Sequence, residues 1–443
     1  MSDGVSHPRG LANETVTAHL AGIGVLLLVA TSPVGSGVGE FMFVKTAALQ
    51  AWLTGVAALT AATRTELVLP TRSRVTDLAM LVGIIGLASA AGTSRVGHSL
   101  VQTLIWLTGG VAFLLVCQCR RQGEIVLGWV FASGVLTAGL GLVQYLFPYS
   151  PVLAFIPQAV PPAATFGNTN VATHIVVPAW VAGVVLARPG ADPAHPARTL
   201  ITGLGIALCL AFIVISEARS AWLAAGVQIV LLVSATALRA DRPPIRLFQR
   251  GQVLRHRRLW IVPVLVFLLL INVDHTGLRP ITELVERNVD ESARDLALSD
   301  QSPSERPYVR LSQWTGAVRV AAQHPLLGAG PDTLQTAHAP HATAYTYRSR
   351  YAHNDYLQIL AETGVTGFLA IVGLAVLAGP LAFRRALGKQ AVIPMVGAVA
   401  VTGVLVQATL SFPLQWIGPV VLVGVLGATG SPSLRAASPP LLR

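Results

Sequence analysis

Long apolar runs separated by short polar segments dominate the pattern along this chain of 443 residues. A run of about 20 apolar residues is the length with which an α-helix crosses the hydrocarbon core of a bilayer. Spanning backbone must also satisfy its own hydrogen bonds. The pattern therefore predicts an all-α, polytopic membrane helix bundle of about twelve transmembrane helices. The predicted spans are residues 17–34, 41–62, 75–92, 99–119, 123–147, 169–187, 199–217, 220–238, 259–273, 364–383, 390–409 and 412–429.

The composition supports this prediction and excludes other classes of protein. Hydrophobic residues make up 53% of the chain and charged residues only 12%, whereas soluble domains carry about 25% charged residues. A chain this long with so little charge cannot form a surface that faces water all round. We therefore expect residues 1–443 to form a single integral membrane domain and not a soluble enzyme.

The distribution of basic residues predicts the orientation in the membrane. The net charge of +11 indicates cytoplasmic loops, which are rich in Lys and Arg, and not a nucleic-acid partner. With the N-terminus in the cytoplasm, twenty basic residues fall in cytoplasmic segments, and the short loops opposite hold only Arg95 and Arg219. This bias predicts a multi-pass protein with both termini in the cytoplasm.

One long loop departs from the charge pattern. Residues 274–354, between predicted spans 9 and 10, lie on the outer side and carry eight arginines. Loops of this length are exempt from the charge rule. A helix is predicted within the loop, because Arg310, Trp314 and Ala317 share one face by their spacing of three and four residues. We expect chemistry in this ordered outer loop.

Arg219 is the first candidate for chemistry. It stands in the sequence SEARSAW, at a helix start in the tight connection between predicted spans 7 and 8. Such an arginine can snorkel to the membrane interface, or it can bind an anion, since the planar guanidinium grips phosphate oxygens and stays charged. Both interpretations remain open on these residues alone.

His353 is the second candidate. The sequence RSRYAHNDYLQILAETG predicts a helix that begins near Asn354, which Asn354 or Asp355 could cap. His353 stands just ahead of this helix, and its ordinary pKa near 6.5 suits a proton acceptor at neutral pH. The alternative is a surface histidine before a helix. Arg348 and Arg350 add positive charge nearby.

The sequences HPLLGAG and TFGNTN predict tight turns. Gly328 and Gly330 could cradle a phosphate, but a structural turn explains the same pattern. Asn168 and Asn170 could cap a helix or bind a sugar, and capping is the simpler interpretation. The chain has no Walker A loop, no Asp-x-Asp pair on the outer side and no His/Cys set with zinc spacing, so we expect no metal and no cofactor.

Together, these motifs resemble the O-antigen ligase and O-antigen polymerase superfamily, also called the Wzy C-terminal family. The resemblance covers about residues 210–370, with the long outer loop before the third-last span in the matching place. The residues that carry it include Arg219, Arg310, Trp314, Gly328, Gly330, His353, Asn354, Tyr356, Glu362 and Gly364.

The resemblance implies a metal-independent, inverting glycosyltransferase of the bacterial inner (plasma) membrane, active on the periplasmic side. It would move a glycan from an undecaprenyl-diphosphate carrier to a hydroxyl of an acceptor, either a glycan or lipid A-core. His353 would be the base, and Arg219 and Arg310 would bind the diphosphate, with support from Arg348 or Arg350. Trp314, Gly328, Gly330, Asn354, Tyr356 and Glu362 would be supporting residues.

Several alternatives remain open. The superfamily contains ligases to lipid A-core, chain polymerases and protein O-oligosaccharyltransferases, and the shared motifs do not identify the acceptor. A transporter or flippase of lipid-linked glycans would also need arginines near a diphosphate, but we expect it to spread them over both membrane sides. A non-catalytic assembly partner could use the outer loop for docking.

Overall fold

A computed structural model gives the structure of the chain. It describes residues 8–30, 38–63, 74–119, 122–148, 162–187, 196–237, 261–274, 277–278, 282–283, 286, 309–341, 350–386 and 392–429. Part of the predicted outer loop, including Arg348, lies outside the described residues.

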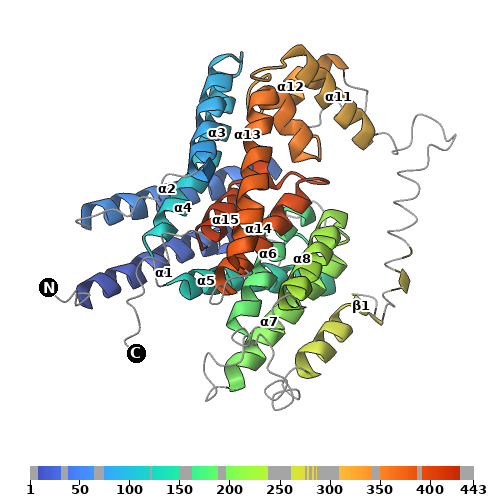
Figure 1. Ribbon diagram of the computed structural model, residues 1–443. Helices are drawn as coiled ribbons and strands as arrows, with labels where there is room; N and C mark the ends of the chain where they lie inside the picture. Colours follow the sequence, from blue (N-terminus) through green and yellow to red (C-terminus); the bar gives the residue numbers. More distant parts are fainter. Residues whose placement is uncertain are drawn as a thin grey trace, which may run out of the picture.

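The described chain is almost entirely helical (Figure 1). One pair of two-residue strands, β1 (Val273–Asp274) and β2 (Gly277–Leu278), pairs in antiparallel register. Ile261–Leu270 forms an apolar helix before β1. The labelled helices are α1 (Pro8–Ala30), α2 (Val38–Thr63), α3 (Arg74–Ala91), α4 (Val96–Cys117), α5 (Gly123–Leu146), α6 (Thr169–Leu186), α7 (Pro196–Ile215), α8 (Arg219–Ala237), α11 (Val309–Gln323), α12 (Leu334–His338), α13 (Asp355–Ala386), α14 (Val392–Gln407) and α15 (Ile417–Thr429), with short 3-10 turns η2 (Ala339–His341) and η3 (Pro413–Gln415).

The predicted all-α, polytopic fold class is confirmed. A helix occupies each of the twelve ranges predicted to span the membrane, and five described helices are long and apolar enough to cross a bilayer. Helix α13 begins at Asp355, in agreement with the predicted helix start near Asn354, and it is interrupted at Gly364, where the tenth predicted span, 364–383, begins.

Glycines allow several helices to approach backbone to backbone. Gly109 of α4 lies against Val420 of α15, where an added Cβ would lie 2.9 Å from the Val420 carbonyl oxygen. Gly424, one turn further along α15, faces the backbone of Gly109. Gly134 of α5 faces Ala179 of α6 in the same way. Such close packing is the usual way in which membrane helices associate, because lipid offers no hydrophobic driving force between them.

The contacts between helices fix their directions. In α6 and α14, Thr173 contacts Gln407 and Val177 contacts Gly403, so these two helices are antiparallel. By the same argument α5 and α7 are parallel, since Gly205 lies against Val135, and Phe212 lies against Gly141 further along both helices.

The helix directions bring several connections to one end of the bundle, which we call the motif end. It contains the N-terminus of α6, the 216–218 connection from α7 to α8, the 408–416 connection from α14 to α15, and the 324–333 turn with the 350–354 segment before α13. The backbone N–H of Asp355 donates to the carbonyl of Ala408, at 2.8 Å, and so ties α13 to this end.

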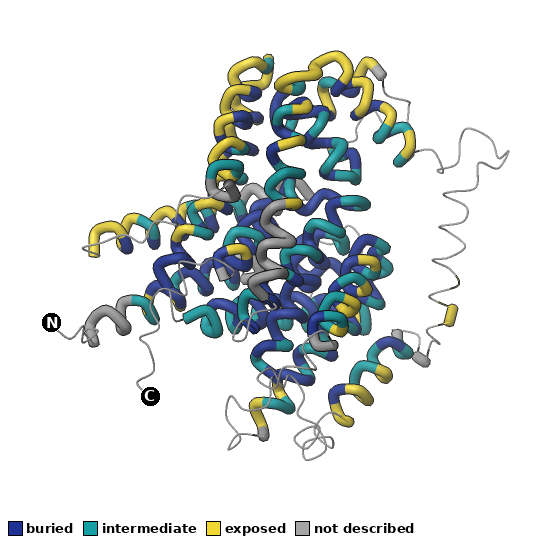
Figure 2. The backbone as a smooth tube through the Cα atoms, viewed as in Figure 1, coloured by how far each residue is buried: buried dark blue, intermediate teal, exposed yellow. Residues whose placement is uncertain are grey.

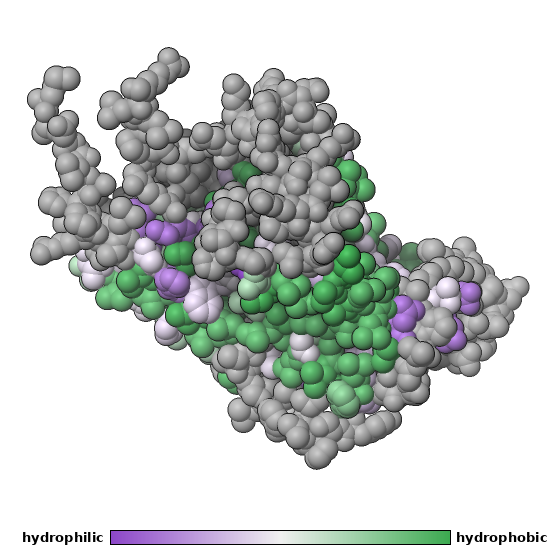
Figure 3. Space-filling view, turned by 90° about the horizontal axis from the view of Figure 1, so that it is seen from below, coloured by the Kyte–Doolittle hydropathy of each residue, from purple (hydrophilic) through white to green (hydrophobic). Residues whose placement is uncertain are grey.

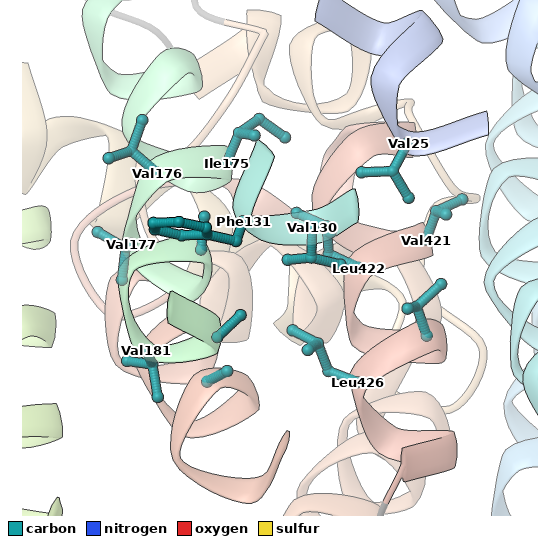
Figure 4. Close-up of a cluster of buried hydrophobic side chains, with 14 of the residues drawn as sticks. Val25, Val130, Phe131, Ile175, Val176, Val177, Val181, Val421, Leu422 and Leu426 are labelled. Atoms are coloured by element: carbon teal, nitrogen blue, oxygen red, sulfur yellow. The ribbon is translucent and has the colours of Figure 1, made fainter. Parts of the chain in front are cut away.

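The core lies around α6 in the centre of the molecule, where Figure 2 shows the buried residues concentrated. Ile175, Val176 and Val177 of α6 are at most 1% exposed. They pack with Val130 of α5 and Leu422 of α15, in the cluster shown in Figure 4. Dense apolar packing of this kind stabilises the bundle through many small dispersion contacts.

Polar side chains inside the bundle are paired across helices. Gln228 of α8 accepts from the indole of Trp180 on α6, at 2.8 Å, and donates to the carbonyl of Val399 on α14, at 3.3 Å. Lys45 of α2 donates to the hydroxyl of Thr165, at 3.1 Å, and lies over the ring of Phe166. These contacts join elements that are distant in the sequence.

Apolar side chains also cover much of the outer surface. Figure 3 shows a broad hydrophobic face, as expected of helices in contact with lipid. Large exposed apolar residues come from several helices. They include Ile84 of α3, Leu104 of α4, Val230 of α8, Leu265 of the Ile261–Leu270 helix and Leu369 of α13.

Candidate active site

The 350–354 segment places His353 at the start of α13. Asn354 caps the helix, as predicted, because its side-chain Oδ1 accepts from the backbone N–H of Leu357 at 3.1 Å. His353 itself has a φ of 52°, in the left-handed region. This conformation is uncommon for a residue other than glycine and turns the chain sharply ahead of the helix. His353 is therefore set by the local backbone and does not lie in a regular helix.

Phe412 forms the aromatic floor beneath His353. The ring of His353 meets Phe412 edge to face, with centroids 4.9 Å apart, and the ring of Tyr351 stacks on Phe412 at 4.4 Å. Trp416 packs beside Tyr351 with centroids 5.6 Å apart. His174 contacts Phe412 from α6, at 6.0 Å. Phe412 thus joins the 350–354 segment to the interior of the bundle.

Asp355 holds the connection that carries Phe412. Its side chain is fully buried, and its carboxylate accepts from the backbone N–H of Leu414 at 2.7 Å and from the side chain of Gln415 at 3.2 Å. Both partners belong to the 408–416 connection. Because Asp355 begins α13, these two hydrogen bonds fix the aromatic floor relative to His353.

Arg310 lies near enough to His353 for its positive charge to act on the histidine. It is the second residue of α11 and half-buried. Burial, and secondly the positive charge of Arg310, lower the pKa of His353 to about 4. The imidazole is therefore neutral at pH 7, which is the form that can accept a proton.

Arg219 lies at the same end of the bundle on a different connection. It is the first residue of α8 and half-buried. The indole of Trp222 donates to the carbonyls of Ile213 and Val214 and folds the start of α8 back on the end of α7. The helix directions thus place Arg219 and His353 together at the motif end.

The glycine-rich turn after α11 packs against a break in α13. Gly364 has φ 67° and ψ −171°, so the helix is interrupted there. Ala329 and Gly330 donate their backbone N–H groups to the carbonyls of Ala361 and Glu362, both at 2.9 Å, and Val365 donates to Pro325 at 2.8 Å. The turn thus supplies hydrogen-bond partners for the backbone N–H and carbonyl groups that the break in α13 leaves without partners inside the helix.

Gly328 and Gly330 are needed for this packing. Both have a positive φ, of 69° and 110°. A Cβ at Gly328 would overlap the backbone of Glu362 and Thr363, and one at Gly330 would lie 2.7 Å from Thr93. Of the two interpretations of the turn, the structural one therefore has direct support, because Gly328 faces protein backbone and Gly330 faces the side chain of Thr93.

Arg350 has a protein partner. Its guanidinium donates to both carboxylate oxygens of Asp332, from Nε at 2.9 Å and from Nη2 at 2.7 Å. Burial by itself would lower the pKa of Arg350, but the hydrogen bond and charge of Asp332 outweigh it and raise this pKa. The predicted role of Arg350 in diphosphate binding therefore competes with a two-point ion pair.

Part of the chain matches a known protein family. The model of the O-antigen ligase family matches residues 204–372. The match covers less than half of the chain, and we call residues 204–372 the O-antigen ligase region. No curated protein matches the chain.

The O-antigen ligase region contains His353, Arg219 and Arg310, but the aromatic floor lies outside it. Phe412 follows the matched region by forty residues and was not among the residues predicted from sequence. The only signal for it was an aromatic pair around a proline in the SFPLQW connection between the last two spans. Asp355 was predicted only as a possible helix cap, and instead it anchors that connection.

The remaining predicted supporting residues of the O-antigen ligase region differ in their contacts. The hydroxyl of Tyr356 donates to the carbonyl of Leu405, at 2.9 Å, and ties α13 to α14. Trp314 is half-buried, and its indole N–H has no hydrogen-bond partner within the described residues. Glu362 is fully buried and accepts from Leu334 and Gln358. Within the described part of the chain, no three His, Cys, Asp or Glu side chains gather as they would around a metal ion.

Proposed function

We propose that this protein is a membrane glycosyltransferase that moves a glycan from an undecaprenyl-diphosphate carrier to a hydroxyl of a surface polysaccharide acceptor. Its O-antigen ligase region supports a ligase or polymerase type of role in surface polysaccharide. The acceptor is either the growing glycan or lipid A-core, and transfer to protein is the alternative within the superfamily. The proposed location is the inner membrane, with both termini in the cytoplasm and the site facing the periplasm.

The observation that carries this proposal is the pairing of a neutral histidine with an arginine at one end of an apolar bundle. Glycosyl transfer from a lipid diphosphate needs a base for the acceptor hydroxyl and positive charge for the leaving group. His353 and Arg310 can supply these two functions, and the effect of the Arg310 charge on the pKa of His353 supports a shared site. Large apolar side chains are exposed on several helices of the bundle, which supports the approach of a polyprenyl carrier from the bilayer.

His353 is the proposed general base. The acceptor hydroxyl oxygen attacks the anomeric carbon while the bond from that carbon to the phosphate oxygen breaks. The hydroxyl proton moves to the neutral imidazole, and the bonding electrons leave with the carrier diphosphate. A single displacement of this kind inverts the anomeric configuration. General-base assistance typically contributes about 10²–10⁴-fold to a rate.

Arg310 and Arg219 are the proposed diphosphate-binding residues. The leaving diphosphate gains negative charge as the sugar bond breaks, and fixed cations that face this charge lower the barrier. Guanidinium groups suit phosphate because they donate two parallel hydrogen bonds and remain charged. Arginines thus provide the charge stabilisation in the proposed metal-independent mechanism.

Donor binding also prepares His353. The diphosphate brings negative charge next to the arginine that lowers the histidine pKa. Negative charge near an imidazole favours its protonated form and raises its pKa. The base therefore becomes stronger when the donor is bound, which directs proton transfer to the complex that can react.

Turnover by purified protein in lipid vesicles tests the proposal. The donor is an undecaprenyl-diphosphate oligosaccharide, offered alone or with lipid A-core, in the presence of a chelator of divalent metals. Product on the carrier identifies a polymerase, and product on lipid A-core identifies a ligase. We expect His353→Ala and Arg219→Ala to lose about 10²-fold or more of the transfer rate.

Arg319→Ala is the matched control, because Arg319 is an exposed arginine of α11. It should keep full activity. If neither acceptor yields product while all variants carry the donor across the vesicle membrane equally, the enzyme proposal is wrong and a transporter replaces it.

A further inference from the structure

The segment that carries His353 is fastened at two points, two residues apart. Arg350 makes the two-point ion pair with Asp332. The backbone N–H of Ala352 donates to the side-chain oxygen of Gln358 at 3.1 Å. The two anchors lie on different elements: Asp332 belongs to the glycine-rich turn and Gln358 to α13. His353 follows directly after the second anchor.

Both anchors lead to one buried carboxylate. The side-chain amide of Gln358 donates to Oε1 of Glu362 at 3.0 Å. The backbone of Asp332 hydrogen-bonds to the same carboxylate, and the backbone N–H of Leu334 donates to Oε1 at 3.3 Å. Glu362 is 0% exposed. Oε1 thus accepts two hydrogen bonds, whereas Oε2 is buried without a hydrogen-bond partner within the described residues, so Oε1 carries the link between the two anchors.

The backbone at His353 explains why two anchors are needed. A residue other than glycine in the left-handed region costs free energy and persists only where its surroundings over-determine it. Asp332 has a φ of 57°, a conformation that Asp tolerates better than most residues. The network therefore joins two sharp turns, one at Asp332 and one at His353, through the buried side chain of Glu362.

We propose that Glu362, Asp332, Gln358 and Arg350 form a positioning network that sets the backbone of His353, and that Arg350 serves this network and not the donor diphosphate. This inference rests on the function proposed above, since it gives His353 a catalytic role. It replaces the predicted role of Arg350 as a diphosphate ligand.

The charges around Arg350 support this assignment. Its two-point pair with Asp332 carries no net charge, so it offers a phosphate little attraction. Releasing Arg350 to a phosphate would leave the Asp332 carboxylate, whose side chain is only 9% exposed, without its cation. It would also leave that negative charge beside the incoming diphosphate.

A double-mutant cycle on the ion pair separates the two roles. The variants are Arg350→Gln, Asp332→Asn and the two together, because Asn keeps the left-handed turn at residue 332. For a positioning network, each single variant lowers kcat by about 10- to 100-fold, the usual effect of a small misplacement of a catalytic group. The donor KM stays within about twofold, and the double variant is no worse than either single one.

A diphosphate role for Arg350 gives the opposite pattern. Arg350→Gln then raises the donor KM, whereas Asp332→Asn lowers it by freeing the arginine, and the two effects combine. This pattern would overturn the proposal. Gln358→Met tests the second anchor, since it keeps the length of the side chain but removes both hydrogen bonds. It should lower kcat with an unchanged donor KM, and Arg319→Gln should change neither.

Hydrogen exchange tests the network without any assay of turnover. Mass spectrometry of the peptide that contains residues 350–354 should show faster amide exchange in Arg350→Gln, Asp332→Asn and Gln358→Met than in the wild type. Unchanged exchange in all three overturns the network even if the enzyme is active. Faster exchange in the three variants, together with a wild-type protein that transfers no glycan, would instead support the network and refute the proposed function.

Discussion

The centre of the bundle and its motif end differ in how the backbone is used. Around α6, Val176 and Val177 lie in a helix at 0% exposure and pack against neighbouring helices. At the motif end, the described non-glycine residues with positive φ occur one in each of four connections: Ala164, Glu217, Asp332 and His353. The comparison shows that the centre of the bundle is stabilised by regular helix packing, whereas the motif end contains irregular backbone held by hydrogen bonds.

The difference has a physical reason. A membrane helix satisfies its own backbone groups, so apolar side chains are sufficient to place it. A site for a polar substrate needs donors and acceptors at angles that a regular helix does not provide. The irregular backbone at the motif end must therefore be stabilised by specific contacts, such as the turn that covers the helix break at Gly364.

The largest expected effect is at the glycine-rich turn. Gly328→Ala combines a positive φ with a Cβ that overlaps the backbone of Glu362 and Thr363. Strain of this kind costs about 1–3 kcal/mol before any overlap is counted. We expect loss of folded protein, or a strong fall in thermal stability in detergent, measured by the unfolding temperature. A variant with wild-type stability would contradict the packing of the turn against α13.

A matched pair of neighbouring glycines tests the bundle in the same way. An alanine Cβ at Gly109 would lie 2.7 Å from a methyl group and 2.9 Å from the carbonyl of Val420, whereas Gly110 has open space. Gly109→Ala should destabilise the fold by about 1–3 kcal/mol, as overpacking does. Gly110→Ala should be neutral or stabilising, since alanine favours the helix. Equal unfolding temperatures of the two variants would refute the close approach of α4 and α15.

The cap of α13 should have a smaller effect. Asn354→Ala removes the side-chain hydrogen bond to Leu357 and should cost about 1 kcal/mol of stability. Asn354→Asp keeps an acceptor at this position and should recover most of this loss. Thermal unfolding of the three proteins measures both changes. A full loss in the aspartate variant would show that Asn354 acts by another contact.

The smallest expected effect is a shift in pH dependence. His353 is active when neutral, so kcat/KM should fall as the pH drops through its pKa of about 4. Arg310→Gln removes one of the two causes that lower this pKa, and the acid limb should then move to higher pH. Burial is the larger cause, so the limb should stay below pH 6.5. An acid limb that does not move in this variant would show that the charge of Arg310 does not act on His353.

The fold could be predicted well from the sequence, and the site only in part. Hydropathy located helices at all twelve predicted ranges, because each span is a local property of about 20 residues. It placed the tenth span only from residue 364, because the buried polar residues Asp355, Gln358 and Glu362 lower the hydropathy of the first turns of α13. The cap at Asn354 was predicted, since capping depends on residues three positions apart.

The sequence by itself determined the class of protein, the positions of its helices and the motifs that mark the O-antigen ligase region. Only the tertiary structure decided that Arg310 acts on His353, that Phe412 lies beneath it and that Arg350 pairs with Asp332. These contacts join residues between 18 and 59 positions apart. Hydrophobic patterns carry no information about such pairs, because these are set by the way in which helices and turns pack together.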